Sequence, residues 1–211
     1  MPEMKSNPIT QIYFDFRSAF DNNPDNTIDF YKKNALILNN ITGFNNKEEL
    51  KYYIELTNKY AEALSNKKRY NLLIDHLNDK LPLIDAELLR LNAIEEKDDW
   101  YYFILFLKGA AFYYLKRYRQ SHIIFRDLSE HDPDNDQYKM WLRYADYGIN
   151  KWLLMVIGGV SILLIFSKLT LRWLIPSPAI ISLLSNIGAI GSFGVLACEF
   201  YLKRSFRKTS K

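Results

Sequence analysis

Three histidines and one cysteine are the side chains best suited to metal binding or nucleophilic catalysis in this 211-residue chain. His76, His122 and His131 form no HxxxH or HxxE pair. We expect His76 and His122 to face a surface or groove and His131 to lie in a solvated turn. The only cysteine, Cys198, lies within an apolar run, so one chain can form neither a disulfide nor a cysteine zinc site. No metal site is therefore expected.

The acidic run at 132–136, with the sequence DPDND, imitates the start of a calcium-binding loop. Gln137 stands where such a loop needs glycine, and Arg143 stands where it needs a bidentate glutamate. We predict a turn that ends one helix and caps the next. Glycine-rich phosphate loops and the GxSxG nucleophile motif are also missing from the sequence. We therefore expect neither an enzyme nor a cofactor.

Charge divides the chain into two unequal parts. Residues 1–151 carry a net charge of −2 and residues 152–211 a net charge of +6, with Glu199 the only acidic residue after Lys151. This division excludes a single soluble domain. It also excludes the uniform basicity that is typical of a nucleic-acid-binding protein.

Two apolar runs follow the division. The first, WLLMVIGGVSILLIF at 152–166, carries no charge, and the second, at 179–202, carries only Glu199. Trp173 and two prolines at 176 and 178 separate them, which is typical of an interfacial turn. We predict a membrane hairpin over 147–202, with spanning helices at about 149–171 and 179–202, and a basic tail at 203–211.

Small residues recur on both predicted spans. They are Gly158, Gly159 and Ser161 on the first and Ser185, Gly188, Ala189 and Ser192 on the second. Small faces let helix backbones approach closely inside a bilayer. We predict that these residues pair the two helices of the hairpin. Formation of a homo-oligomer through the same faces stays open as a second use.

The basic residues predict an orientation for the hairpin. Eight lie beside the outer ends of the two spans or in the tail, whereas only Lys168 and Arg172 lie in the connection. By the positive-inside rule, we expect an integral membrane protein with both termini in the cytoplasm. The N-terminal residues lack the apolar core of a secretory signal, which agrees with a cytoplasmic location for residues 1–146.

Apolar residues in the first 146 positions recur at helical rather than strand spacing, so we predict an all-α fold. We expect Asn26 or Thr27 to cap the second helix and Gly43 to end it. The apolar run at 100–115 contains Lys108 near its centre, so we interpret it as a buried helix and not as a third span. The expected helices cover 9–20, 27–38, 47–64, 69–81, 85–96, 100–116, 120–130 and a last one from 137 that continues into the membrane.

Residues 102–135 resemble a tetratricopeptide repeat. The residues that carry the resemblance, at the family's spacings, are Leu105, Gly109 and Phe112 on one helix, Ser121 and Phe125 on the next, and Pro133 after it. The chain departs from the family pattern at Leu105, Lys108 and Ser121, where Trp, Leu and Ala are usual. The resemblance implies a pair of antiparallel helices that approach closely at Gly109, and a stack of such pairs with a groove for a protein ligand.

A weaker copy of this unit lies near residues 50–80. Residues 61–77 align with 109–125 at an offset of 48, which places Lys68-Arg69-Tyr70 over Lys116-Arg117-Tyr118. The offset exceeds the 34-residue family period by 14, and we expect a short extra helix at 84–96 to account for it.

The sequence therefore predicts a cytoplasmic helical-repeat domain at 1–146 that binds a protein partner and is anchored by the hairpin. The residues expected to contact this unidentified partner are Tyr70, Lys116, Arg117 and Tyr118, because tyrosines and basic side chains suit interfaces. A membrane-anchored domain of this kind is expected to act as a scaffold or adaptor. The alternative is a membrane-disrupting or pore-forming effector, whose hairpin is controlled by the helical domain; Asn186, Glu199 and the glycine-rich second span favour it.

Overall fold

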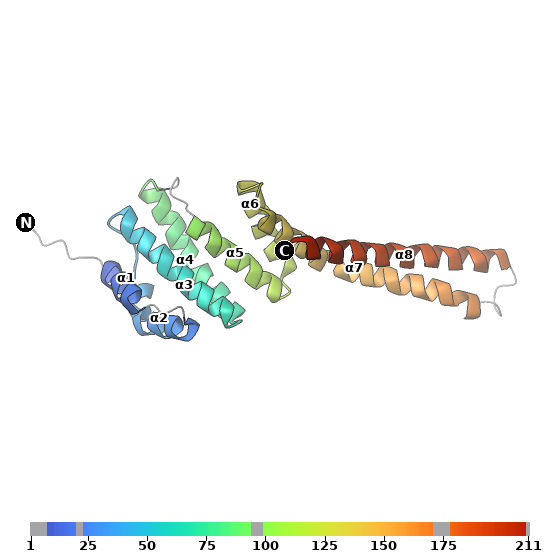
Figure 1. Ribbon diagram of the computed structural model, residues 1–211, viewed down its shortest axis with the longest axis horizontal. Helices are drawn as coiled ribbons and strands as arrows, with labels where there is room; N and C mark the ends of the chain where they lie inside the picture. Colours follow the sequence, from blue (N-terminus) through green and yellow to red (C-terminus); the bar gives the residue numbers. More distant parts are fainter. Residues whose placement is uncertain (1–7, 20–22, 94–98, 171–177, 210–211) are drawn as a thin grey trace, which may run out of the picture. The chain divides into compact units, whose positions relative to one another are not determined.

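The computed structural model describes residues 8–19, 23–93, 99–170 and 178–209. Every regular element in these ranges is an α-helix, which confirms the all-α class (Figure 1). The helices are α1 (Pro8–Ala19), α2 (Pro24–Asn39), α3 (Lys47–Asn66), α4 (Tyr70–Arg90), α5 (Asp99–Tyr114), α6 (Tyr118–His131), α7 (Asp136–Thr170) and α8 (Pro178–Thr209).

The chain forms two compact units, Met1–Asp132 and Pro133–Lys211. The first contains α1 to α6 and the second contains α7 and α8. The division falls before the expected domain boundary at 146, because the predicted last helix and the first apolar run are one continuous helix, α7. The connection expected around Trp173 lies outside the described residues.

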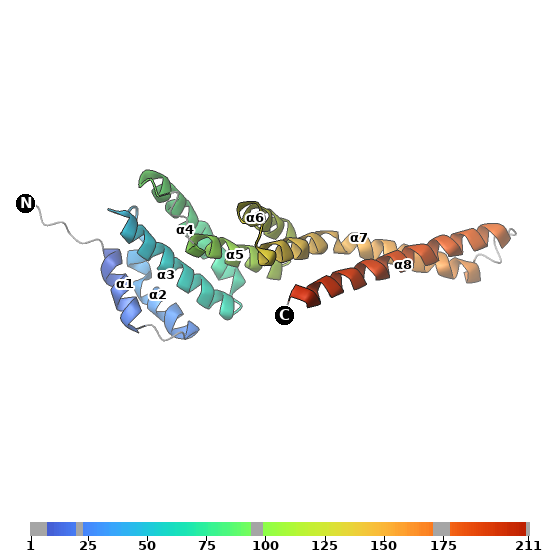
Figure 2. The same ribbon diagram turned by 45° about the horizontal axis from the view of Figure 1, so that its top comes forward.

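The first unit is a stack of three helical pairs in chain order, as Figures 1 and 2 show from the α1–α2 pair to the α5–α6 pair. The first helix of each later pair packs against both helices of the pair before it: α3 contacts α1 and α2, and α5 contacts α3 and α4. Within this unit, α6 packs against α5. This arrangement is compatible with a helical repeat, in which each pair buries the face that its neighbour leaves open.

The core of the first unit comes from one apolar stripe on each helix. α3 buries Leu50, Tyr53, Leu56 and Leu64, and α5 buries Tyr101, Ile104, Leu107 and Ala111 against the same cluster. The apolar run at 100–115 is therefore a core helix of this unit, as expected from the sequence.

The start of α2 differs from the prediction. Asn23, and not Asn26 or Thr27, is the N-cap: its side chain accepts a hydrogen bond from the backbone N–H of Asp25 at 3.0 Å. Pro24 is the first helical residue, and its fixed φ angle and missing N–H suit that position. The helix therefore begins three residues before the predicted start.

The region 70–90 also differs from the prediction, because the two short helices expected there are one helix, α4, with Pro82 in its interior. A proline removes one backbone hydrogen bond and usually bends or ends a helix. Here the buried residues Leu77 and Leu81 before it and Ile84 and Leu88 after it lie on one continuous stripe. Packing of this stripe holds both halves of α4 in one helix. The extra residues of the 48-residue offset thus lie in a longer helix and the connection after it.

In the second unit, α7 and α8 run side by side in opposite directions (Figure 1). α7 bends by 46° between Asp136–Lys151 and Leu154–Phe166. Among the described residues, no single helix is both long and apolar enough to cross a membrane, whereas these two pieces of α7 satisfy the limits of length and composition when taken together.

Candidate partner-binding surface and hairpin interface

The two turns aligned from the sequence have the same backbone conformation. Lys68 and Lys116 are both left-handed, with φ of 55° and 60°. In both turns the residue after the lysine donates its backbone N–H to a carbonyl five residues earlier: Arg69 to Leu64 and Arg117 to Phe112, each at 2.8 Å. The helix that follows begins at Tyr70 in one case and Tyr118 in the other. The 48-residue offset is therefore a structural repeat of helix, turn and helix.

The residues that carry the family resemblance lie mostly where α5 meets α6. A Cβ atom on Gly109 would lie 3.0 Å from the Phe125 ring, so the two helices approach as closely there as expected. Ser121 and Phe125 are fully buried and Phe112 is buried. Leu105 is part-buried and packs against the core, and Pro133 is exposed just after the first unit.

A chain of four tyrosines connects the two turns. Tyr70 stacks on Tyr114 with ring centroids 4.8 Å apart and planes within 12° of parallel. Tyr114 meets Tyr113 edge to face at 5.9 Å, and Tyr113 meets Tyr118 in the same way at 5.4 Å. We call these four residues the tyrosine ladder. The structure thus brings together two of the predicted partner-binding residues, Tyr70 and Tyr118, through Tyr113 and Tyr114.

The turns beside the tyrosine ladder are basic. Lys68, Arg69, Lys116, Arg117 and Arg119 are all exposed. In the part of the chain that the structure describes, Lys68, Lys116, Arg117 and Arg119 form no ion pair with an acidic side chain. This end of the first unit therefore presents aromatic rings and positive charge without a compensating carboxylate.

His76, expected on a surface or in a groove, is part-buried in an aromatic cluster between α2, α3 and α4. Its ring meets Tyr31 at 5.0 Å and Tyr60 at 4.8 Å, both edge to face, while the two tyrosines stack on each other at 4.0 Å. Its Nε2 atom is buried and has no hydrogen-bond partner among the described residues. Burial, together with the positive charge of Lys80, lowers the pKa of His76 to about 3, so the ring is neutral near pH 7.

The other two histidines both lie on α6. His131, expected in a solvated turn, is the last residue of α6, and its exposed side chain stacks on Tyr102 with centroids 3.7 Å apart. His122 is part-buried on α6. Within the described ranges, no group of three or more His, Cys, Asp or Glu side chains is arranged to hold a metal ion.

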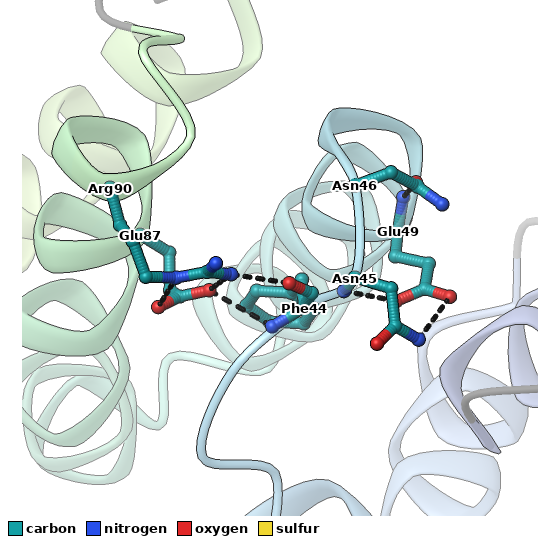
Figure 3. Close-up of polar contacts among 6 residues, drawn as sticks. All are labelled: Phe44, Asn45, Asn46, Glu49, Glu87 and Arg90. Carbon is teal, nitrogen blue, oxygen red and sulfur yellow. Dashed lines mark hydrogen bonds and ion pairs between the residues drawn. The ribbon is translucent and has the colours of Figure 1, made fainter.

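Glu87 joins the end of α4 to the loop before α3, a role that the sequence did not indicate (Figure 3). Its carboxylate accepts a hydrogen bond from the backbone N–H of Phe44 at 2.9 Å, and Arg90 donates to the same carboxylate and to the Phe44 carbonyl. The bond from Arg90 holds the pKa of Glu87 below its ordinary value. Asn46 then caps α3 through the Glu49 N–H at 2.9 Å. These contacts fix where α3 begins relative to α4.

Glycines and a serine allow α7 and α8 to approach closely. A Cβ atom on Gly188 would lie 2.7 Å from the Ser161 carbonyl oxygen and 2.9 Å from the Cβ of Leu164, and one on Gly191 would overlap Ser161. Gly158 faces Val195, with 3.8 Å from its added Cβ to a Val195 methyl group.

Of the remaining residues predicted to pack the hairpin, some lie in the α7–α8 interface and some lie outside it. Ser185 and Ser192 are part-buried. Ala189 is exposed, and a Cβ atom on Gly159 would meet nothing within 4 Å. The interface therefore includes Ser161, as predicted, and Gly191, which the predicted set lacked, and leaves Gly159 and Ala189 outside.

Comparison with known proteins identifies no relative: no protein-family model, curated protein or solved structure matches this chain. The tetratricopeptide resemblance consequently depends on the residues and contacts described above.

Proposed function

We propose that this protein is a membrane-anchored adaptor of the tetratricopeptide type, in which α7 and α8 cross a bilayer and the first unit binds an acidic protein partner. The observation that carries the proposal is the tyrosine ladder together with the unpaired basic residues of the two turns.

The outer surface of the second unit supports the membrane part of the proposal. Large apolar side chains on α7 and α8 point away from the partner helix, with Leu163 72 % and Phe193 78 % exposed. Such an apolar surface needs an apolar environment. The apolar part of α8, Ser182–Ala197, corresponds to about 24 Å, and the helix continues beyond it at both ends, so that flanking residues would complete the ~30 Å of a hydrocarbon core. The excess of basic residues outside the connection favours cytoplasmic positions for both termini.

The partner part of the proposal follows from charge and ring geometry. Tyrosine offers a large apolar contact area with few rotatable bonds, and it is enriched at interfaces. Cationic side chains without acidic neighbours attract an acidic segment and increase the rate of encounter. An adaptor fixed to a bilayer also raises the local concentration of what it binds.

The experiment compares two charge-reversal variants of the full chain in membranes. Lys116→Glu with Arg117→Glu changes the surface beside the tyrosine ladder. Lys32→Glu with Lys33→Glu makes the same change on exposed residues of α2. After chemical cross-linking and mass spectrometry, we expect an acidic partner that is recovered with the wild type and the α2 variant and lost with the turn variant. Equal recovery with both variants would contradict the proposed surface.

The second candidate function, a pore-forming effector, is favoured by the polar Asn186 on the exposed face of α8. It predicts that the purified full chain releases a small dye from vesicles without any added partner. The adaptor predicts vesicles that stay sealed.

A further inference from the structure

The outer face of α8 carries two exposed polar residues, Ser182 and Asn186, among apolar ones. Leu184, Gly188 and Val195 are buried or part-buried and define the side of the helix that packs on α7. Asn186 lies on the opposite side and is exposed, one helical turn from Ile190, which is 73 % exposed. No described residue forms a hydrogen bond with the Asn186 side chain.

The outer face of α7 differs in this respect. Its exposed residues between Leu154 and Phe166 are all apolar: Met155, Val156, Ile157, Gly159, Val160, Ile162, Leu163 and Phe166. That face suits lipid chains along its whole length. The α8 face does not, because an amide in hydrocarbon loses its hydrogen bonds to water and lipid tails offer no replacement.

In the proposed membrane arrangement, Asn186 would lose these hydrogen bonds because it lies inside the bilayer and not at its surface. Asn186 lies eight residues after Pro178, the first residue of α8, which corresponds to about 12 Å along the helix. Its neighbours Leu183 and Ile187 are exposed and apolar. A short amide side chain at this depth does not reach the headgroup region along the helix.

We propose that the outer face of α8 binds a second copy of this chain, with the amides of the two Asn186 residues hydrogen-bonded to each other across the interface. An amide is both donor and acceptor, so two identical amides satisfy one another about a two-fold axis. Polar side chains of this kind stabilise helix pairs in membranes and select one register. The inference rests on the proposed membrane insertion of α7 and α8.

The test is disulfide cross-linking of the full chain, purified and reconstituted in phosphatidylcholine vesicles. Cys198→Ser removes the natural thiol, and Ile190→Cys places a single thiol one turn from Asn186 on the same face. A matched control places the thiol at Leu163→Cys, which is equally exposed but lies on the outer face of α7. We expect an oxidised dimer from the cysteine at position 190 and little from the one at position 163.

Two further substitutions in the Ile190→Cys protein identify the amide as the cause. Asn186→Leu should reduce dimer yield by about 3- to 30-fold at limiting protein-to-lipid ratio, and Asn186→Gln should retain most of it. Equal cross-linking with Asn186→Leu, or equal cross-linking at positions 190 and 163, would overturn the inference.

Alkaline carbonate extraction of the same vesicles tests membrane insertion separately from self-association. A chain that stays in the vesicles but does not cross-link at position 190 overturns only the self-association. A chain that carbonate extracts overturns the membrane insertion and the self-association together.

Discussion

The two units of this protein place their large and small side chains in opposite ways. In the described part of the first unit most of the large apolar side chains are inside, as Phe125 is, although some, such as Phe14 and Leu36, are exposed. In the second, Leu163 and Phe193 point outward, and glycine and serine lie between the helices. The first pattern is stabilised by removing apolar surface from water. The second depends on close backbone contact, which is how helices associate where the surroundings are apolar.

The largest effect on the free energy of unfolding should appear when one phenylalanine is truncated in each unit. Phe125→Ala should lower the free energy of unfolding of the first unit by about 3–5 kcal/mol, because it removes a fully buried ring and leaves a cavity. Phe193→Ala removes an exposed ring and should change the stability of the hairpin by less than about 0.5 kcal/mol. Urea and SDS titrations of the full chain in detergent micelles, followed by circular dichroism, measure the stability of the first unit and of the hairpin. Comparable losses would contradict the difference between the units.

Enlarging a glycine provides the converse test within the second unit. Gly188→Leu forces a side chain into the Ser161 backbone and should destabilise the hairpin by about 1–3 kcal/mol. Gly159→Leu adds the same side chain where nothing lies within 4 Å, and we expect no measurable loss. SDS titration in micelles compares the two variants. If Gly159→Leu were the more disruptive, the pairing of α7 with α8 would be incorrect.

A smaller effect should follow loss of the Glu87 carboxylate in the first unit. Glu87→Ala leaves the buried Phe44 N–H without its acceptor and should cost about 1 kcal/mol or somewhat more. Glu87→Gln keeps an acceptor oxygen and should cost less. Urea unfolding of both variants tests this order, and loss of protection from hydrogen exchange at the Phe44 N–H would locate the effect.

The smallest effect is a pH dependence from His76. The unfolded histidine binds a proton below its ordinary pKa of 6.5, whereas the folded one binds only near 3, so the unfolded state takes up more protons between these values. Stability should therefore fall as the pH falls through 6.5, by about 0.7 kcal/mol between pH 7 and pH 6. The groups that set this pKa include Lys80 and Asp79. His76→Phe should remove this part of the slope in urea unfolding at the two pH values, and an unchanged slope would show that His76 is not its source.

The helices of the first unit could be predicted from the sequence because each has an apolar stripe at helical spacing. The repeat of 48 residues was also visible, because Lys68-Arg69-Tyr70 and Lys116-Arg117-Tyr118 have the same residue types. Their left-handed lysines confirm that the same residues form the same turn. Local sequence decides such turns, since the hydrogen bonds that close them join residues only a few positions apart.

Contacts between distant residues could not be predicted. Pro82 indicates a break in the sequence, and only the burial of Leu81 and Ile84 against neighbouring helices shows why α4 continues. The tyrosine ladder depends on the stacking of Tyr70 on Tyr114, which lie 44 positions apart. His76 is part-buried against Tyr31 and Tyr60, which lie 45 and 16 positions before it.

The sequence by itself determined the helical class, the position of the apolar runs and the charge difference between the two parts, because these follow from residue type and spacing along one helix. The tertiary structure decided which face of each helix is inside. That choice placed Gly188 against Ser161 and left Asn186 outside. The physical reason is that a helix offers several faces, and the one that is buried depends on which neighbour fits it closely.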